Sequence, residues 1–159
     1  MESKKRHIEI DFMYLDVSVC TRCQGTDASL EEAVSEVARV LELAGAEVVV
    51  RKTHIQSEHQ AQEMGFVSSP TILINGRDIQ EFPKESLCES CTDLVGGEPC
   101  NCRVWTYEGR EYNAPPTALI EDAILREVYG GGRIECCPQK SLDIPDNIKR
   151  FLAARKKVE

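Results

Sequence analysis

Eight cysteines, all in close pairs, are the feature that most constrains this chain of 159 residues. The pairs are Cys20 with Cys23, Cys88 with Cys91, Cys100 with Cys102, and Cys136 with Cys137. Eight cysteines in 159 residues lie below the density that marks a disulfide scaffold. In a reducing compartment, closely spaced thiols more often serve catalysis or metal binding than structural bridges. The pairs therefore predict redox or metal chemistry.

Length and charge limit the other classes of function. The chain is long enough for one domain with a hydrophobic core, so we expect a single domain over residues 1–159. A net charge of -8 argues against a nucleic-acid partner, since such proteins carry basic patches. The longest apolar runs, such as "TILI" at 71–74, are too short to span a membrane, and no export signal follows the basic start. We therefore expect a cytoplasmic protein that contacts neither nucleic acid nor membrane.

The hydrophobic periodicity predicts alternating strands and helices. The expected strands are 7–19, 46–55, 71–74 and 77–80, and the Asn75-Gly76 turn joins the last two. The expected helices are 29–44, 57–64, 115–129 and a short one from Pro145. Ser29 and Glu32 form a capping box at the start of the first helix. Because the interruption "GTD" at 25–27 precedes the capping signals, we expect the first cysteine pair on a loop that leads into the helix.

Residues 84–116 break this pattern. They contain four cysteines, several turn residues and a hairpin expected to turn at Glu108-Gly109. We interpret this stretch as a cysteine-rich insertion within the domain, before its last core helix. Residues 133–159 form a C-terminal extension.

The order of the elements resembles that of the thioredoxin-like superfamily. The matching residues are Cys20-Thr21-Arg22-Cys23 after the first strand and "SSPTILING" at 68–76. The resemblance implies an α/β fold with a central mixed sheet flanked by helices. It also implies a cis bond between Ser69 and Pro70, which would lie against the cysteine pair and contact a substrate chain. The inserted cysteines and the Cys-Cys tail indicate an uncharacterised, cysteine-rich branch.

For Cys20 and Cys23 we consider three alternatives: a redox pair, part of a metal or metalloid site, or inert core thiols. A helix N-terminus and the Arg22 guanidinium would lower a cysteine pKa, so that Cys20 attacks and Cys23 resolves the mixed disulfide. Asp16 would serve as a proton acceptor if it faces the pair.

The other pairs favour metal binding or secondary redox roles. Four thiols in fifteen residues, Cys88, Cys91, Cys100 and Cys102, suit a tetrahedral zinc site that would stabilise a loop without its own core, although two local disulfides are an alternative. Cys136 and Cys137 would form a strained, easily reduced disulfide, clamp a soft ion, or simply pack as small apolar side chains.

Our leading hypothesis from sequence is a thiol-disulfide oxidoreductase that acts on protein thiols or disulfides and requires no organic cofactor, with zinc in the insertion. The first alternative is a protein that binds or transfers a soft metal or metalloid of the zinc, mercury or arsenic type. The second is a thioredoxin-like interaction scaffold without redox function.

Overall fold

The fold is seen in a computed structural model that describes residues 6–80, 82–97, 99–130 and 144–158. The strands are β1 (Arg6–Tyr14), β2 (Ala46–His54), β3 (Thr71–Ile74), β4 (Arg77–Asp78), β5 (Lys84–Leu87), β6 (Asn101–Tyr107) and β7 (Arg110–Tyr112). The helices are α1 (Thr21–Leu43), α2 (Glu58–Met64), α3 (Glu89–Leu94), α4 (Thr117–Tyr129) and α5 (Asp146–Val158).

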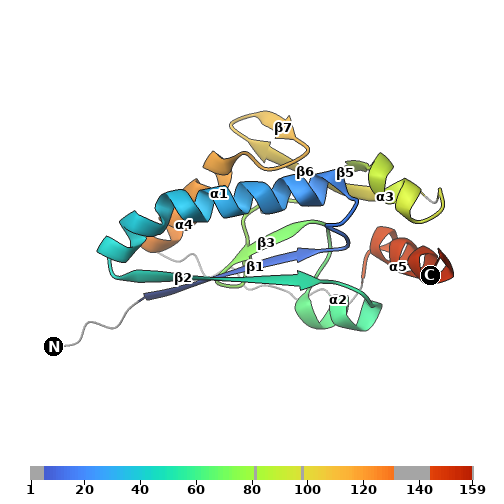
Figure 1. Ribbon diagram of the computed structural model, residues 1–159, viewed down its shortest axis with the longest axis horizontal. Coiled ribbons are helices and arrows are strands. Elements are labelled where there is room, and N and C mark those ends of the chain that lie inside the picture. The colour runs from blue at the N-terminus through green and yellow to red at the C-terminus, as the bar shows by residue number, and fades with distance from the viewer. Residues whose placement is uncertain (1–5, 81, 98, 131–143, 159) are drawn as a thin grey trace.

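The central sheet has four strands in the order β2-β1-β3-β4. β1 runs parallel to β2 and antiparallel to β3, and β3 pairs antiparallel with β4. Helices α1 and α4 lie on one face of this sheet, and α2 lies on the other (Figure 1). The predicted α/β class, with a central mixed sheet flanked by helices, is therefore confirmed, and the strand order is compatible with a thioredoxin-like sheet. The extent of the single domain stays a prediction.

Alternation along β1 builds the core under α1 and α4. Ile8, Ile10 and Phe12 are buried on one face, whereas Glu9 and Asp11 point to the other and remain accessible. The buried side chains of α1 and α4 that pack against that face recur at helical spacing: Leu30, Ala33, Val37 and Leu41 from α1, and Ile120, Ile124 and Val128 from α4. This core fixes α1 along the sheet and so determines where its N-terminus lies.

The predicted start of α1 was wrong. The helix begins at Thr21 rather than at residue 29, with Cys20 as its N-cap, so Cys23 lies in the first turn. The sequence "GTD" at 25–27 does not interrupt the helix. Glycine is needed at position 25 for packing, since a Cβ there would lie 2.9 Å from the Cβ of Ala114. Thr26 is buried within the helix, where its hydroxyl donates to the Arg22 carbonyl at 2.7 Å.

The turn predictions were confirmed, whereas the predicted capping box of Ser29 and Glu32 was wrong because both residues lie inside α1. Asn75 and Gly76 both have positive φ and join β3 to β4, as their sequence predicts. Ser57 caps α2, and Gly65 ends it in the left-handed region. Glu108 and Gly109 form the predicted second turn, between β6 and β7. The expected strand 7–19 stops earlier, at Tyr14, and β4 contains two residues only.

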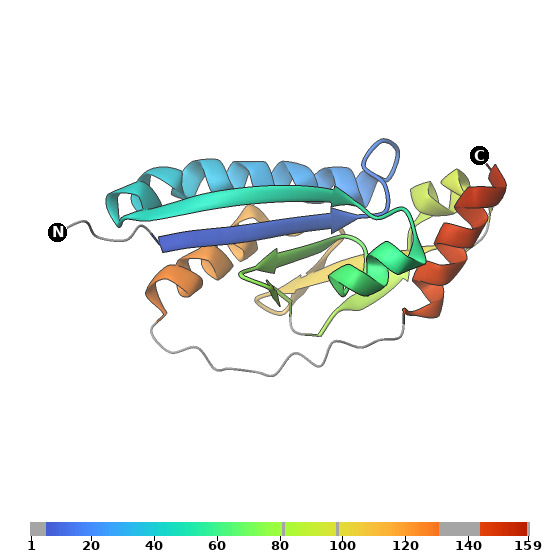
Figure 2. The ribbon, with the colours of Figure 1, turned by 90° about the horizontal axis from the view of Figure 1, so that it is seen from below.

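The stretch 84–116 contains a second sheet, in the order β5-β6-β7, and the short helix α3. Neither β5 nor α3 was predicted. Figure 2 shows α5 across the end of the molecule beside α3 and α2. Within the described residues, no helix is long and apolar enough to cross a membrane.

Arg103 joins the second sheet to the first. Its side chain is fully buried, forms a two-pronged ion pair with Asp78 at 2.7 and 2.9 Å, and donates to Thr71 at 3.1 Å. Its guanidinium also lies 5.0 Å from the ring centroid of Trp105. Its backbone N–H donates to the Ser69 carbonyl at 2.7 Å. Because one residue supplies all these contacts, it fixes β6 against β3 and β4.

We expect Asp78→Asn to lower the free energy of unfolding by about 3 kcal/mol, because it leaves a buried guanidinium without its counter-charge. Glu9→Gln is the matched control, because it removes a carboxylate from the more than half-exposed pair with Arg51 and should cost less than about 1 kcal/mol. Urea denaturation followed by circular dichroism measures both. Equal, small losses would contradict the role given to Arg103.

Candidate metal centre

Cys20 is positioned by the loop between β1 and α1. The Asp16 carboxylate, 3% exposed, accepts backbone N–H bonds from Val19 at 2.6 Å and from Cys20 at 3.0 Å. It also accepts the Ser18 hydroxyl at 3.0 Å. With its oxygens occupied by these donors, Asp16 acts as a positioning residue for Cys20. Its predicted role as proton acceptor stays a prediction.

The insertion brings three more thiols to the same place. Cys88 caps the start of α3, Cys91 lies within α3, and Cys102 lies on β6. The backbone N–H of Cys88 donates to the Cys100 carbonyl at 2.8 Å, which continues the pairing of β5 with β6. These three cysteines are separated along the sequence, and the pairing of β5 with β6 brings them close together in the fold.

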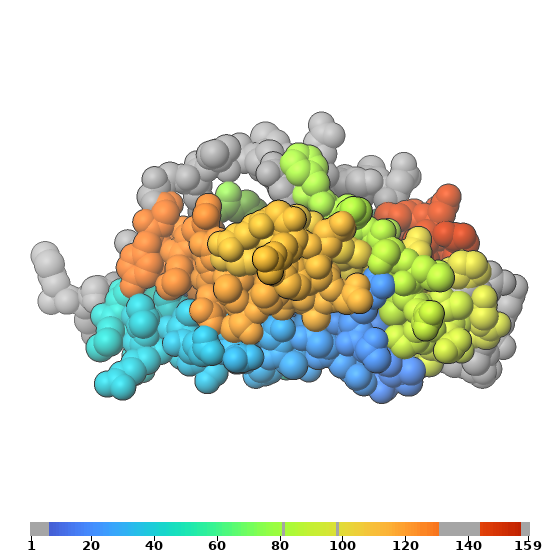
Figure 3. Space-filling view, turned by 90° about the horizontal axis from the view of Figure 1, so that it is seen from above, coloured from blue at the N-terminus to red at the C-terminus, as the bar shows by residue number. Residues whose placement is uncertain are grey.

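Arg22 fastens the start of α1 to the insertion. Its guanidinium donates to the carbonyls of Ser86 and Cys102, both at 3.2 Å, and to that of Leu87 at 2.8 Å. Figure 3 shows the start of α1 and the yellow-green α3 side by side on the surface. Arg22 was expected to activate a thiol; the structure shows it holding three carbonyls of the insertion.

Four sulfur atoms meet at this junction. The Sγ atoms of Cys20, Cys88, Cys91 and Cys102 all lie within 4.8 Å of one another, and each residue is at most 2% exposed. Cys20 Sγ is 3.9 Å from Cys88 Sγ and 3.8 Å from Cys102 Sγ, and Cys91 Sγ is 3.4 Å from Cys102 Sγ. These separations are too long for disulfide bonds, and the described cysteines are all free. The four thiols could hold a metal ion.

This set differs from the predicted one in one member: Cys20 takes the place of Cys100. Cys100 is buried and belongs to the same end of the core, but it does not lie within 4.8 Å of all the others. The sequence offered no signal for this exchange, because Cys20 is 68 residues away from Cys88. Only the docking of the insertion on α1 brings them together.

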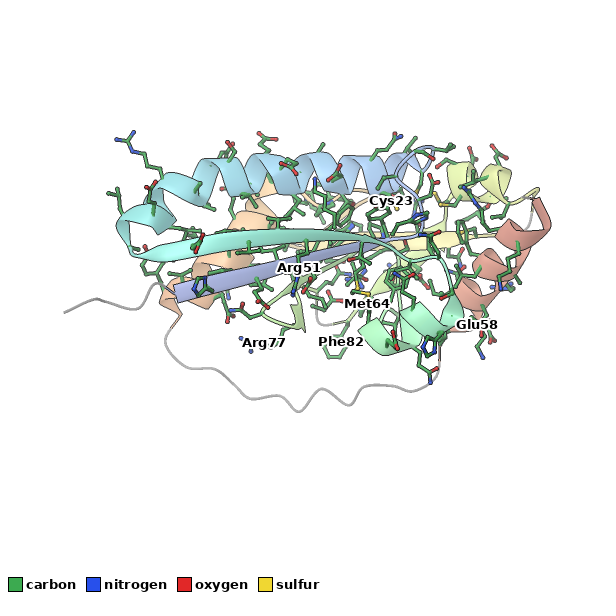
Figure 4. All side chains as sticks on the ribbon, turned by 60° about the horizontal axis from the view of Figure 1, so that its bottom comes forward. Cys23, Arg51, Glu58, Met64, Arg77 and Phe82 are labelled. Atoms are coloured by element: carbon green, nitrogen blue, oxygen red, sulfur yellow. The ribbon has the colours of Figure 1, made fainter. Side chains whose placement is uncertain are left out.

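Cys23 is a fifth buried thiol beside the four. Its backbone N–H points to Cys20 Sγ at 3.5 Å, and its own Sγ lies 3.6 Å from Ser69 Oγ. Figure 4 shows Cys23 at the start of α1 on the side that faces the sheet. The bond between Ser69 and Pro70 is cis, as the resemblance predicted. Ser69 also accepts the Leu15 N–H at 3.1 Å, and it is fully buried.

The pKa values of the buried thiols differ from one another. Hydrogen bonding from Cys102 lowers the pKa of Cys20 and lowers that of Cys88 to about 6. The pKa of Cys100 is lowered to about 5, also chiefly by Cys102. Hydrogen bonding to Cys100 raises the pKa of both Cys91 and Cys102. At neutral pH the metal-free cluster therefore contains both thiolates and thiols.

The surroundings of the cluster are apolar with cations at the edge. Ile148, Phe151 and Leu152 of α5 belong to the same buried core. Arg150 of that helix contributes to lowering the pKa of Cys100, and Arg155 lies 3.8 Å from the Asp16 carboxylate. A group with net negative charge is thus accommodated by cations of α5.

Two further features lie away from the cluster. Cys136 and Cys137 fall outside the described residues, so their predicted role stays a prediction.

On the sheet face opposite α1, a hollow of about 300 Å³ is lined by Asp11, Met13, Arg51, Thr53, Met64 and Leu73, with Arg51 and Met64 labelled in Figure 4. Its charged groups pair with each other, since Arg51 binds Asp11 at 2.8 Å.

The fold and the site define an α/β protein with a buried cluster of free thiols. The chain belongs to the family described as a domain of unknown function (DUF2703), whose model matches residues 8–124. That range includes the six described cysteines and ends before α5. No curated protein and no solved structure matches the chain.

Proposed function

We propose that this protein binds one thiophilic metal ion, with zinc as the favoured ion, through the thiolates of Cys20, Cys88, Cys91 and Cys102. The observation that carries the proposal is the spacing of the four sulfurs. Thiolates arranged tetrahedrally at about 2.3 Å from a zinc ion lie about 3.8 Å apart. The three Sγ separations of 3.4, 3.8 and 3.9 Å scatter around that value.

The number and burial of the sulfurs distinguish between ions. Four converging thiolates with no exposed position suit a closed site of the structural kind, in which no coordination position is left for a substrate. An iron-sulfur cubane would need each thiolate on a different iron, and hence a wider spacing of the sulfurs. Arsenite retains a lone pair and takes fewer thiolates. Mercury and cadmium remain competitors of zinc, because thiolates prefer soft ions.

Binding would also stabilise the fold locally. The four side chains occupy core positions at the end of the molecule where α1, α3, β6 and α5 meet. An ion would replace weak thiol contacts with bonds that join α1 to the insertion, and its binding free energy would add to that of folding.

We expect the anaerobically purified, reduced chain to bind one zinc or cadmium ion. Serine at position 20, 88, 91 or 102 should weaken binding by at least about 100-fold, because three thiolates no longer close the tetrahedron. Cys100→Ser is the matched control, a buried thiol of the same core outside the set of four, and should keep the stoichiometry. Elemental analysis and cadmium-thiolate absorbance provide the measurement.

Two results of the binding experiment would contradict the proposal. If Cys20→Ser keeps full affinity while Cys100→Ser loses it, the ion is held within the insertion alone. If the reduced wild-type chain binds no thiophilic ion, there is no metal centre.

Metal affinity should rise steeply with pH. Near pH 7.5, Cys20 and Cys88 have lowered pKa values and are thiolates, whereas Cys91 and Cys102 have raised pKa values and keep their protons. Zinc must displace about two protons, so the association constant should increase about 100-fold per pH unit, and more steeply as the pH falls below the Cys88 value of about 6. Competition with a chelator of known pH dependence measures this slope. A slope near zero would contradict the proton assignment.

A second candidate function is thiol-disulfide exchange through Cys20 and Cys23. It is supported by the position of Cys20 at the N-cap of a long helix and by the contact of Cys23 with Ser69, which precedes the cis proline. These features agree with the resemblance to the thioredoxin-like superfamily, of which we propose the chain to be a distant member. Against it, both sulfurs are fully buried, whereas attack on a protein disulfide requires an accessible sulfur.

The two functions differ in a reductase assay. If exchange is the main activity, the metal-free chain should reduce a model protein disulfide, and Cys20→Ser should abolish turnover because it removes the attacking thiol. Cys100→Ser serves again as the control, because it leaves the Cys-x-x-Cys pair intact. Absence of turnover in the reduced wild-type chain would leave metal binding as the function.

A further inference from the structure

We propose that Cys23 is a resolving thiol that makes oxidative release of the bound ion reversible, by joining Cys20 in a disulfide after a peroxide-class oxidant has oxidised Cys20. This inference rests on the proposed metal centre and adds a redox control to it. It starts from a thiol that the four-cysteine set leaves unused although it lies against one of the ligands.

The geometry favours this pair. Cys20 caps α1 and Cys23 lies in its first turn, so the backbone places the two side chains on the same helix end. The Sγ of Cys20 already accepts the Cys23 N–H at 3.5 Å, which holds that sulfur over the first turn. Cys23 Sγ contacts Ser69 Oγ rather than the insertion, so it remains available while the four ligands hold the ion.

The identity of the oxidised ligand makes the step effective. Three of the four ligands come from the insertion, and Cys20 alone comes from α1. Taking Cys20 out of the set leaves three thiolates and removes the sulfur bond between α1 and the insertion. A site that needs four ligands to close would lose its ion.

The chemistry balances with hydrogen peroxide as the oxidant. The Cys20 thiolate attacks one peroxide oxygen, the O–O bond breaks, and a sulfenic acid and a hydroxide ion form. The Cys23 thiol then attacks the sulfenic sulfur, the S–O bond breaks, and water leaves as the S–S bond forms. Two electrons pass from the two sulfurs to the peroxide, and the ion departs with three thiolates left behind.

Because both thiols are buried, only a small oxidant can reach them. Cys20 and Cys23 are fully buried, so a folded partner cannot align its disulfide with either sulfur. The neighbours of Cys20 are accessible, however: Val19 is 47% exposed and Thr21 is exposed. A molecule of the size of water needs only a small local opening at this loop.

The test uses the full-length chain loaded with one equivalent of zinc and treated with hydrogen peroxide. Zinc release is followed with a chromogenic chelator, and disulfides are mapped by mass spectrometry after alkylation. The wild-type chain should release its ion, contain a Cys20–Cys23 disulfide, and bind zinc again after reduction with dithiothreitol. Cys23→Ser should bind one zinc ion and lose it once Cys20 is oxidised, but without a partner thiol the sulfenic acid should oxidise further, so that dithiothreitol restores at least about tenfold less zinc binding than in the wild type.

Two further variants keep the outcome clear. Cys23→Ala repeats the test without a hydroxyl beside Ser69, and circular dichroism confirms that both variants are folded. Cys100→Ser removes the other spare thiol, which hydrogen-bonds Cys91 and Cys102; whatever it does to the release rate, the Cys20–Cys23 disulfide and the recovery of zinc after reduction should be kept.

The possible failures are distinguishable. If wild-type chain binds no zinc, the metal centre itself fails, and the redox control fails with it. If zinc binds but the Cys23 variants regain zinc after dithiothreitol as fully as the wild type, or if Cys100→Ser is the variant that fails to regain it, the metal centre stands and the role of Cys23 is overturned.

Discussion

Burying four thiols against one another is the interaction on which this end of the protein depends. At the other end, α1 and α4 cover the sheet with leucine, isoleucine and valine, which need no partner. Here the core positions are four sulfur atoms that all lie within 4.8 Å of one another, some with lowered and some with raised pKa values. Thiol contacts alone hold such a cluster weakly, whereas the ion that we propose would join all four sulfurs strongly. Under that proposal, the cluster would respond to pH and to oxidants.

Two arginines hold the elements that carry the thiols in place. Arg22 holds three carbonyls of the insertion against the start of α1, and Arg103 holds β6 against β3 and β4 through Asp78. Bidentate, charged hydrogen bonds are directional, so they orient as well as attract. Asp16 orients Cys20 in the same way from the loop that precedes α1. The two arginines thus fix the insertion at two points, and Asp16 positions the thiol that meets it.

Local patterns were predictable where the backbone itself sets the conformation. Asn75-Gly76 forms its turn because both positions accept positive φ, and Ser57 and Gly65 bound α2 by capping. The same rules failed at the start of α1. Gly25 was read as a break in the helix, but it is there because Ala114 packs against it, and that neighbour is distant in the chain.

The sequence by itself determined that the chain alternates strands and helices and that its cysteines occur in close pairs, while the mixed sheet was implied by the resemblance to the thioredoxin-like superfamily. Periodicity and spacing are properties of neighbouring residues, so they can be read directly. Only the tertiary structure decided which thiols lie together: it placed Cys20 among Cys88, Cys91 and Cys102, left Cys100 out, and set Cys23 beside Ser69. Contacts across 68 residues depend on how the insertion docks on α1, and that docking follows from the half-buried Arg22, the buried Arg103 and packing that no local pattern records.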